Sequence, residues 1–179
     1  MFDFATFPTI ETERLLLREI TNADASAIYH IFNDHETMRY YETPYTSLEQ
    51  AHDQVQLHKR RFREKTGIRW GIAFKHAPAR LIGNCGFNPR LYGNHADIGY
   101  VLAREHWRSG IMYEAVNAIL PFGFEALELQ RIEAWIFPDN AASARLAEKL
   151  GFTYEGLLRG YLFGQDILMY GLLRGEVAE

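Results

Sequence analysis

The chain has 179 residues, 47% of them hydrophobic and 23% charged, which is typical of one folded domain and excludes a disordered or collagen-like chain. Its 19 basic and 23 acidic residues give a formal net charge of −4, so no bulk positive charge would hold nucleic acid or an anionic membrane. No apolar run approaches the roughly 20 residues that span a bilayer, and the single cysteine, Cys85, lies in an apolar run and is expected to be buried. We therefore expect a soluble cytoplasmic domain.

The first third of the chain predicts one strand and two helices. Thr12–Glu19 is a short apolar run between charges, which favours a strand. Thr21 or Asn22 can cap a helix that runs to about residue 32. Ser47–Gln50 reads as a capping box, so a second helix is expected from there to about residue 65.

The middle of the chain changes to short apolar or alternating runs between turn-rich segments. These runs predict an antiparallel meander of three strands: Arg69–Lys75, Leu81–Phe87 and Asp97–Leu102.

The helical period then returns over Met112–Leu127, where Pro121 should kink the helix or shorten its regular part. A strand, a helix and two further strands are expected after it: Arg131–Phe137, Ala141–Leu150, Phe152–Arg159 and Ile167–Leu173. This order predicts a single α/β (α+β) domain. Its mixed, mostly antiparallel sheet would be flanked by helices, with a parallel pair where the Met112 helix joins two strands.

One segment with chemical potential is the polar loop around Gly110, which connects a strand to the start of a helix. Backbone N–H groups converge at such a place and suit an anion such as a phosphate. An ordinary strand-to-helix connection explains a single glycine equally well. No phosphate-binding Walker loop or G-x-G-x-x-G is present, so nucleotide hydrolases and dehydrogenases are disfavoured.

A second segment places Asn140 at a helix N-cap, Ser143 three residues on, and Gly151 at the helix end. An asparagine cap needs no function. A functional role for Asn140 and Ser143 is expected only if this helix cap and the Gly110 loop face the same cleft.

The two segments together resemble the GNAT acetyltransferase superfamily, most closely the Rim-type ribosomal-protein N-terminal acetyltransferases. The resemblance runs from about Thr12 to about Gly171. It is carried by DIGYVL at Asp97–Leu102, RIEAWIFPDNAASARLAEKLGF at Arg131–Phe152 and YEG at Tyr154–Gly156. It implies an acetyltransferase domain over residues 12–174, an N-terminal extension over 1–11, and a splayed central pair of strands. The implied reaction is direct transfer of an acetyl group from acetyl-CoA to a primary amine in a ternary complex.

The resemblance also assigns roles to residues. Asn140 would bond the pantetheine arm, and Ser143 would lie near the thioester sulfur and hydrogen-bond the developing thiolate. Arg108 stands where this group usually has a glycine, and its guanidinium could pair with phosphate. The implied cofactor-binding residues are those of one strand end and the following loop: Tyr100, Val101, Leu102, Trp107, Arg108, Ser109, Gly110, Ile111, Met112 and Tyr113.

The general base is the point at which this sequence departs from the family pattern. Rim-type enzymes often carry a glutamate where this chain has Gly160. The candidate replacements are Asp97, Glu133 and Asp166, each of which could instead be a solvated strand-end carboxylate. Asp97 is the preferred catalytic base together with Ser143, although a chain of water could also take the proton from a partly neutral amine.

The histidines and the basic run are expected to be structural. His52 and His58 are six residues apart on one helix, which is not the spacing of a zinc site, so no metal is expected and the histidines should lie at the surface or in a cleft. Lys59–Arg63 is expected to form a solvated helix face.

By the same resemblance, the acceptor amine would enter between residues 33–45 and 160–166. An aromatic and acidic lining would favour a cationic amine; its candidates are Glu36, Tyr40, Tyr41, Glu42 and Tyr45. A protein N-terminus, a polyamine, an aminoglycoside, an amino acid and a peptide antibiotic all stay open, as do a monomer and a homodimer. The alternatives are a degenerate acyl-CoA-binding sensor or interaction module, and a detoxifying small-molecule acetyltransferase.

Overall fold

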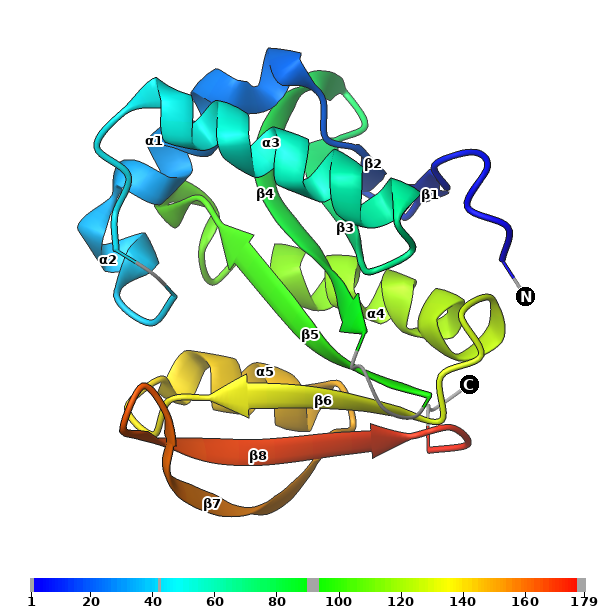
Figure 1. Cartoon of the computed structure of the whole chain (residues 1–179), viewed down its shortest axis with the longest axis vertical. Coiled ribbons are helices and arrows are strands. Elements are labelled where there is room, and N and C mark those ends of the chain that lie inside the picture. The colour runs from blue at the N-terminus through cyan, green and yellow to red at the C-terminus, as the bar shows by residue number, and fades with distance from the viewer. Residues whose placement is uncertain (1, 42, 90–93, 177–179) are drawn as a thin grey trace.

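A computed structural model describes residues 2–41, 43–89 and 94–176, which form an eight-stranded sheet with helices on both faces (Figure 1). Helices α1 and α3 cover one face, and α4 and α5 cover the other. The sheet order is β1-β2-β3-β4-β5-β6-β8-β7. The strands are β1 (Ile10–Glu11), β2 (Leu15–Glu19), β3 (Ile68–Phe74), β4 (Ala77–Pro89), β5 (His95–Leu102), β6 (Arg131–Ile136), β7 (Thr153–Leu162) and β8 (Gln165–Leu173). The helices are α1 (Ala25–Asn33), α2 (His35–Met38), α3 (Leu48–Arg63), α4 (Ile111–Glu125) and α5 (Ala141–Lys149), with short 3₁₀ turns η1 (Asn22–Asp24) and η2 (Arg104–His106).

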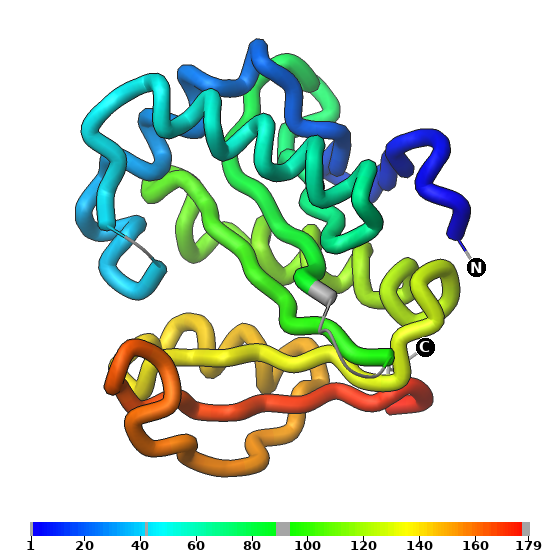
Figure 2. Tube along the Cα trace, in the orientation of Figure 1, coloured from blue at the N-terminus to red at the C-terminus, as the bar shows by residue number. Residues whose placement is uncertain are grey.

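The centre of the sheet confirms the predicted mixed topology. β5 and β6 are parallel, and they pair only over His95–Asp97 and Arg131–Glu133. Beyond these residues the two traces diverge (Figure 2). All other neighbouring strands are antiparallel. The parallel connection runs through α4, as the sequence predicted.

Most predicted elements lie within a few residues of their expected bounds. At the start of α3, Ser47 Oγ accepts from Gln50 N at 3.4 Å and Gln50 Oε1 accepts from Ser47 N at 3.1 Å, which confirms the capping box. The short elements α2 and β1 were not predicted. α4 continues through Pro121 to Glu125, because the carbonyl that the proline leaves without a donor belongs to the exposed Asn117 and can bind water.

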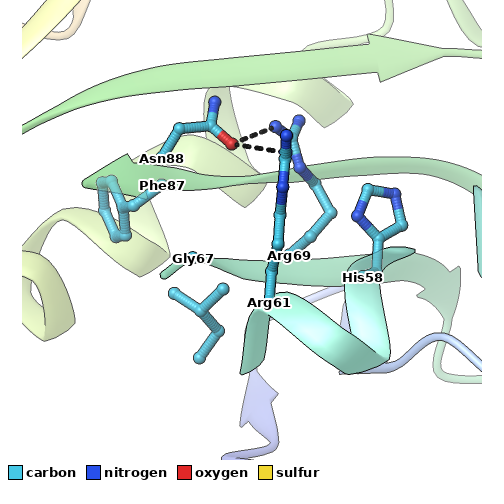
Figure 3. Close-up of a pocket in the computed structure, with 7 residues that line it drawn as sticks. His58, Arg61, Gly67, Arg69, Phe87 and Asn88 are labelled. Atoms are coloured by element: carbon cyan, nitrogen blue, oxygen red, sulfur yellow. Dashed lines mark hydrogen bonds between the residues drawn. The ribbon is translucent and has the colours of Figure 1, made fainter. Parts of the chain in front are cut away.

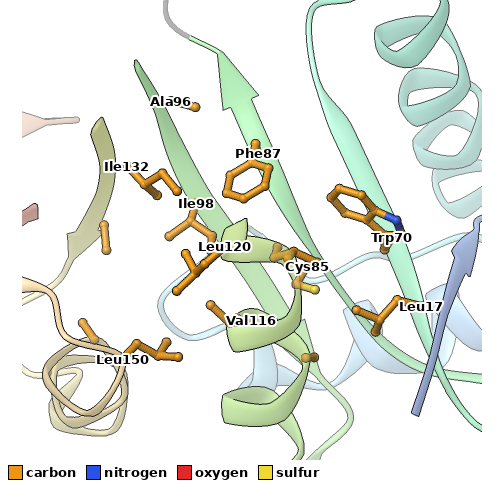
Figure 4. Packing of buried hydrophobic residues seen from close by; sticks show 14 of the residues in the cluster. Leu17, Trp70, Cys85, Phe87, Ala96, Ile98, Val116, Leu120, Ile132 and Leu150 are labelled. Atoms are coloured by element: carbon orange, nitrogen blue, oxygen red, sulfur yellow. The ribbon is translucent and has the colours of Figure 1, made fainter. Parts of the chain in front are cut away.

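The main hydrophobic core lies between the sheet and the α4–α5 layer. Figure 4 shows Trp70 and Phe87 from the strands packed with Val116 and Leu120 of α4. Cys85 is fully buried among these side chains, as expected. A second cluster lies under α1 and α3.

The segment before Thr12 packs against the same domain. Phe4 and Phe7 contact Phe62, with ring centroids 5.3 and 4.9 Å apart. Trp70 Nε1 donates to the carbonyl of Pro8 at 2.7 Å. No helix in the described ranges combines the length and the apolar character that a membrane crossing requires.

Candidate active site

The loop before α4 presents backbone N–H groups at the start of a helix. Gly110 is the N-cap of α4 with φ +77°, and no side chain caps this end. The first turn of a helix leaves its N–H groups without intrahelical partners, here those of Ile111, Met112 and Tyr113. A Cβ added at Gly110 would meet only Arg14 Nη2, at 3.6 Å, so the approach to these groups is open. This geometry suits a phosphate.

The residues of this loop differ in what they can offer a ligand. Arg108 has φ +59°, a conformation that favours glycine and costs other residues about 1 kcal/mol. Its side chain is exposed. Trp107 Nε1 donates to the carbonyl of Leu102 at 2.8 Å, and Ser109 Oγ donates to that of His106 at 2.5 Å. These two side chains therefore hold the loop in shape.

Contacts with the core, with α5 and with the residue before β2 hold the first turn of α4 in place. The side chain of Ile111 is buried in the core, which leaves only its main chain available to a ligand. Lys149 Nζ lies 4.3 Å from the ring centroid of Tyr113. Arg14 donates to the carbonyl of Ser109 at 3.1 Å and pairs with Glu114 at 2.6 Å, which joins β2 to the start of α4.

The structure brings the second sequence segment against β5. Asn140 Oδ1 accepts from Ser143 N at 3.1 Å and so caps α5. The hydroxyls of Tyr100 and Ser143 share a hydrogen bond of 2.5 Å. Burial raises the pKa of Tyr100 to about 12, although the hydrogen bond shared with Ser143 opposes part of this rise. Tyr100 is therefore neutral near pH 7 and keeps a proton to donate.

Two of the three candidate bases lie side by side. Asp97 and Glu133 are partners in the parallel register of β5 and β6. Glu133 accepts from Arg131 Nε at 2.9 Å and from Trp135 Nε1 at 3.1 Å, so both of its oxygens are engaged. Asp97 Oδ2 accepts from Asn88 Nδ2 at 3.0 Å.

The third candidate lies elsewhere, on the hairpin between β7 and β8. Asp166 Oδ1 accepts from the backbone N–H of Gly160 at 2.8 Å. Gly160 has φ +62°, which gives a physical reason for glycine at this position. The hairpin turns through Phe163 and Gly164, with φ +51° and +75°, as expected for a tight two-residue turn.

A cleft of about 980 Å³ lies between the α2 region, the end of β6 and this hairpin. Tyr40, Tyr41 and Tyr45 line it, as the resemblance implied, whereas Glu36 does not and instead lies 3.6 Å from Arg39. Glu42 is outside the described residues. Across the cleft, Tyr40 donates to the carbonyl of Asp139 at 3.1 Å.

Sequence reasoning missed two aromatic walls of the cleft, Phe137 and Phe163. Phe137 stacks on Tyr40 with centroids 6.4 Å apart, and Phe163 is 91% exposed at the hairpin tip. Phe163 followed by Gly164 is a turn signal that could have placed an aromatic side chain at a hairpin tip.

Two side chains of α3, His58 and Arg61, lie differently from what the sequence predicted. His58 is only 6% exposed rather than at the surface or in a cleft. Arg61 reaches inward to Asn88 rather than belonging to a solvated face. The apolar spacing of Ala51, Val55 and Phe62 on α3 also includes His58, a signal that could have placed this histidine inside.

Over the described ranges, no group of three or more His, Cys, Asp or Glu side chains could hold a metal ion.

Comparisons with known proteins agree with this arrangement. Residues 14–153 match the family model for the acetyltransferase (GNAT) domain. The uncharacterized N-acetyltransferase YoaA of Bacillus subtilis is 44% identical over 159 residues, which cover 88% of this chain and 89% of that protein. The ribosomal protein uS5-alanine N-acetyltransferase of Escherichia coli is 29% identical over 164 residues, covering 86% and 82%. The structure of Mycobacterium smegmatis RimJ in complex with CoA-disulfide has a TM-score of 0.83 at 22% identity, covering 100% of this chain and 93% of RimJ.

Proposed function

The chain belongs to the GNAT acetyltransferase family and is an acetyl-CoA-dependent acyltransferase, and from this premise we propose that it acetylates a primary amine held in the aromatic cleft. The reaction is direct attack of the amine on the thioester while both substrates are bound. The observation that carries this proposal is the divergence of β5 from β6 after three paired residues. It leaves the β6-facing edge of β5 available next to Ser143 and the start of α4.

The residues around this opening fit the parts of acetyl-CoA. The N–H groups of Ile111, Met112 and Tyr113 would bind the pyrophosphate, and the exposed guanidinium of Arg108 would add a charge partner. The edge of β5 at Tyr100, Val101 and Leu102 would pair with the pantetheine amides. Acetyl-CoA supplies the activated acetyl group. The domain, over residues 12–174, needs no metal for this step.

Charge stabilisation is assigned to the end of β5 and to α5. The N–H group of Leu102 faces away from β4, because its neighbour Ala103 donates to Ile82 O on β4 at 2.9 Å. It would donate to the thioester oxygen as that oxygen gains negative charge, a contribution of a few kcal/mol in comparable sites. Ser143 would donate to the departing sulfur. Tyr100 would donate to Ser143, which turns the serine proton toward the sulfur. Asn140 would donate from its amide nitrogen to the pantetheine arm while its oxygen caps α5.

Asp97 is the proposed base. It precedes Leu102 by five residues of extended strand, or roughly 17 Å. The proton of the attacking amine would therefore pass through water to the Asp97 carboxylate. Glu133 is less suited because Arg131 and Trp135 occupy both of its oxygens.

The acceptor class follows from the cleft. Its aromatic walls and the carboxylates of Asp139 and Asp166 favour a cationic amine attached to an apolar or extended group. We place the N-terminal amine of a polypeptide first, because one relative is an acetyltransferase of a ribosomal-protein alanine. A small-molecule amine is the second candidate.

The test is release of free thiol from acetyl-CoA in the presence of N-terminal peptides, polyamines, aminoglycosides and amino acids. We expect release that depends on at least one amine, and Ser143→Ala should lower turnover more than it lowers the affinity for acetyl-CoA. Binding of acetyl-CoA with no amine-dependent release across the panel would contradict the proposal and favour an acyl-CoA sensor.

A further inference from the structure

A largely buried polar cluster lies between α3 and the sheet around Asn88, the hydrogen-bond partner of Asp97 (Figure 3). We call it the Asn88 cluster; its members are His58, Arg61, Arg69, Asn84 and Asn88. Arg69 and His58 are each only 6% exposed. A buried guanidinium is costly unless its N–H groups find acceptors, so its partners indicate what the cluster is built around.

Both guanidiniums of the cluster converge on one atom. Arg61 Nη1 and Arg69 Nη2 each donate to Asn88 Oδ1, at 3.3 Å. Figure 3 shows the two side chains approaching this oxygen together. Because a guanidinium can only donate, the Asn88 oxygen must face the arginines and its nitrogen must face away.

The nitrogen of Asn88 faces Asp97. Asn88 and Asp97 are register partners on β4 and β5, and Nδ2 donates to Asp97 Oδ2 at 3.0 Å. The absence of a side chain at Gly99 is part of the same arrangement. A Cβ there would lie 2.9 Å from Arg69 Nη2, so glycine is what lets the guanidinium lie across β5.

We propose that Asn88, oriented by Arg61 and Arg69, is the positioning residue for the general base Asp97. The inference rests on the assignment of Asp97 in the proposed function. A neutral amide that donates to a carboxylate favours its charged form and holds its direction, and the two arginines fix the direction of the Asn88 amide. Among the titratable groups around this pair, Glu133 on β6 is the register partner of Asp97, His95 lies two residues before it on β5, and His58 on α3 lines the same cavity as Asn88.

The decisive variant is Asn88→Asp. A carboxylate has nearly the same shape and would still accept from both arginines, so the fold should be kept. It has no proton to donate to Asp97, and it adds a negative charge beside it. We expect an unchanged or higher thermal midpoint, kcat lower by roughly tenfold, an unchanged KM for acetyl-CoA, and an acid limb of the pH profile at higher pH.

Two variants complete the measurement. Asp97→Asn should slow kcat by about a hundredfold and remove the acid limb. Asn84→Ala removes a different buried amide, whose Oδ1 lies 3.4 Å from Arg69 Nη1, without touching Asp97, and should leave the position of the acid limb unchanged.

The outcomes separate the two claims. In one outcome the Asp97→Asn variant has a low kcat, while the Asn88→Asp variant keeps the wild-type kcat and pH profile. This result would overturn the role of Asn88 and leave the assignment of Asp97 as the base standing. An Asp97→Asn variant as fast as the wild type would overturn the base and the inference together.

Discussion

Buried His58 should make this protein less stable in acid, and the structure gives the size of the effect. The ring is buried on α3, and burial first, then the charges of Arg69 and Arg61, lowers its pKa from 6.5 to about 3. The folded state therefore holds His58 neutral, whereas the unfolded chain binds a proton near pH 6.5. The stability that depends on the neutral ring is fully present above pH 6.5 and is lost as pH falls toward 3.

Each pH unit by which the pH falls within this window lowers the free energy of unfolding by about 1.4 kcal/mol. At pH 5 the loss is about 2 kcal/mol, and it reaches about 4 kcal/mol at pH 3. This is a large fraction of the stability of a typical domain, which is about 5–15 kcal/mol.

The assay is urea unfolding followed by tryptophan fluorescence at pH 7.5 and pH 5, on wild type, His58→Gln and His52→Gln. His52 lies on the same helix and is exposed, so its variant is a matched control. The difference in unfolding free energy between wild type and His58→Gln should shrink by about 2 kcal/mol from pH 7.5 to pH 5, because only the wild type must protonate a buried ring. His52→Gln should follow the wild type. A difference that stays constant over this range would refute the reasoning.

Two further predictions concern the hydroxyl pair and the buried thiol. Tyr100→Phe removes the proposed donor to Ser143 and should lower kcat about threefold to tenfold at constant KM for acetyl-CoA. The loss should nearly vanish in a Ser143→Ala background, and full additivity would refute the coupling. Burial raises the pKa of Cys85 from 9.0 to about 12, so the stability tied to its neutral thiol is present below pH 9 and is lost as pH rises toward 12. Wild type should lose about 2 kcal/mol more than Cys85→Ala between pH 9 and 10.5 in urea unfolding, and parallel curves would contradict this.

Local sequence signals predicted the elements that frame the site. The capping box at Ser47, the cap at Asn140 and the alternation along β5 depend on neighbours a few residues apart, which is why they could be read without a structure. The missed α2 is a four-residue helix stabilised chiefly by the side chain of Asp34, too short to show a hydrophobic period.

The sequence by itself determined the family, the parallel pair and two segments of the candidate site, because these follow from motifs and element order. Only the tertiary structure decided which side chains face one another. Asn88 and Asp97 are nine positions apart, Tyr100 and Ser143 are 43 apart, and Tyr40 reaches Asp139 across 99 positions. Such contacts depend on strand register and helix placement, which no local pattern encodes. The same reason explains why Arg61, in a charged run, bonds to Asn88 and why His58, on a polar helix, is buried.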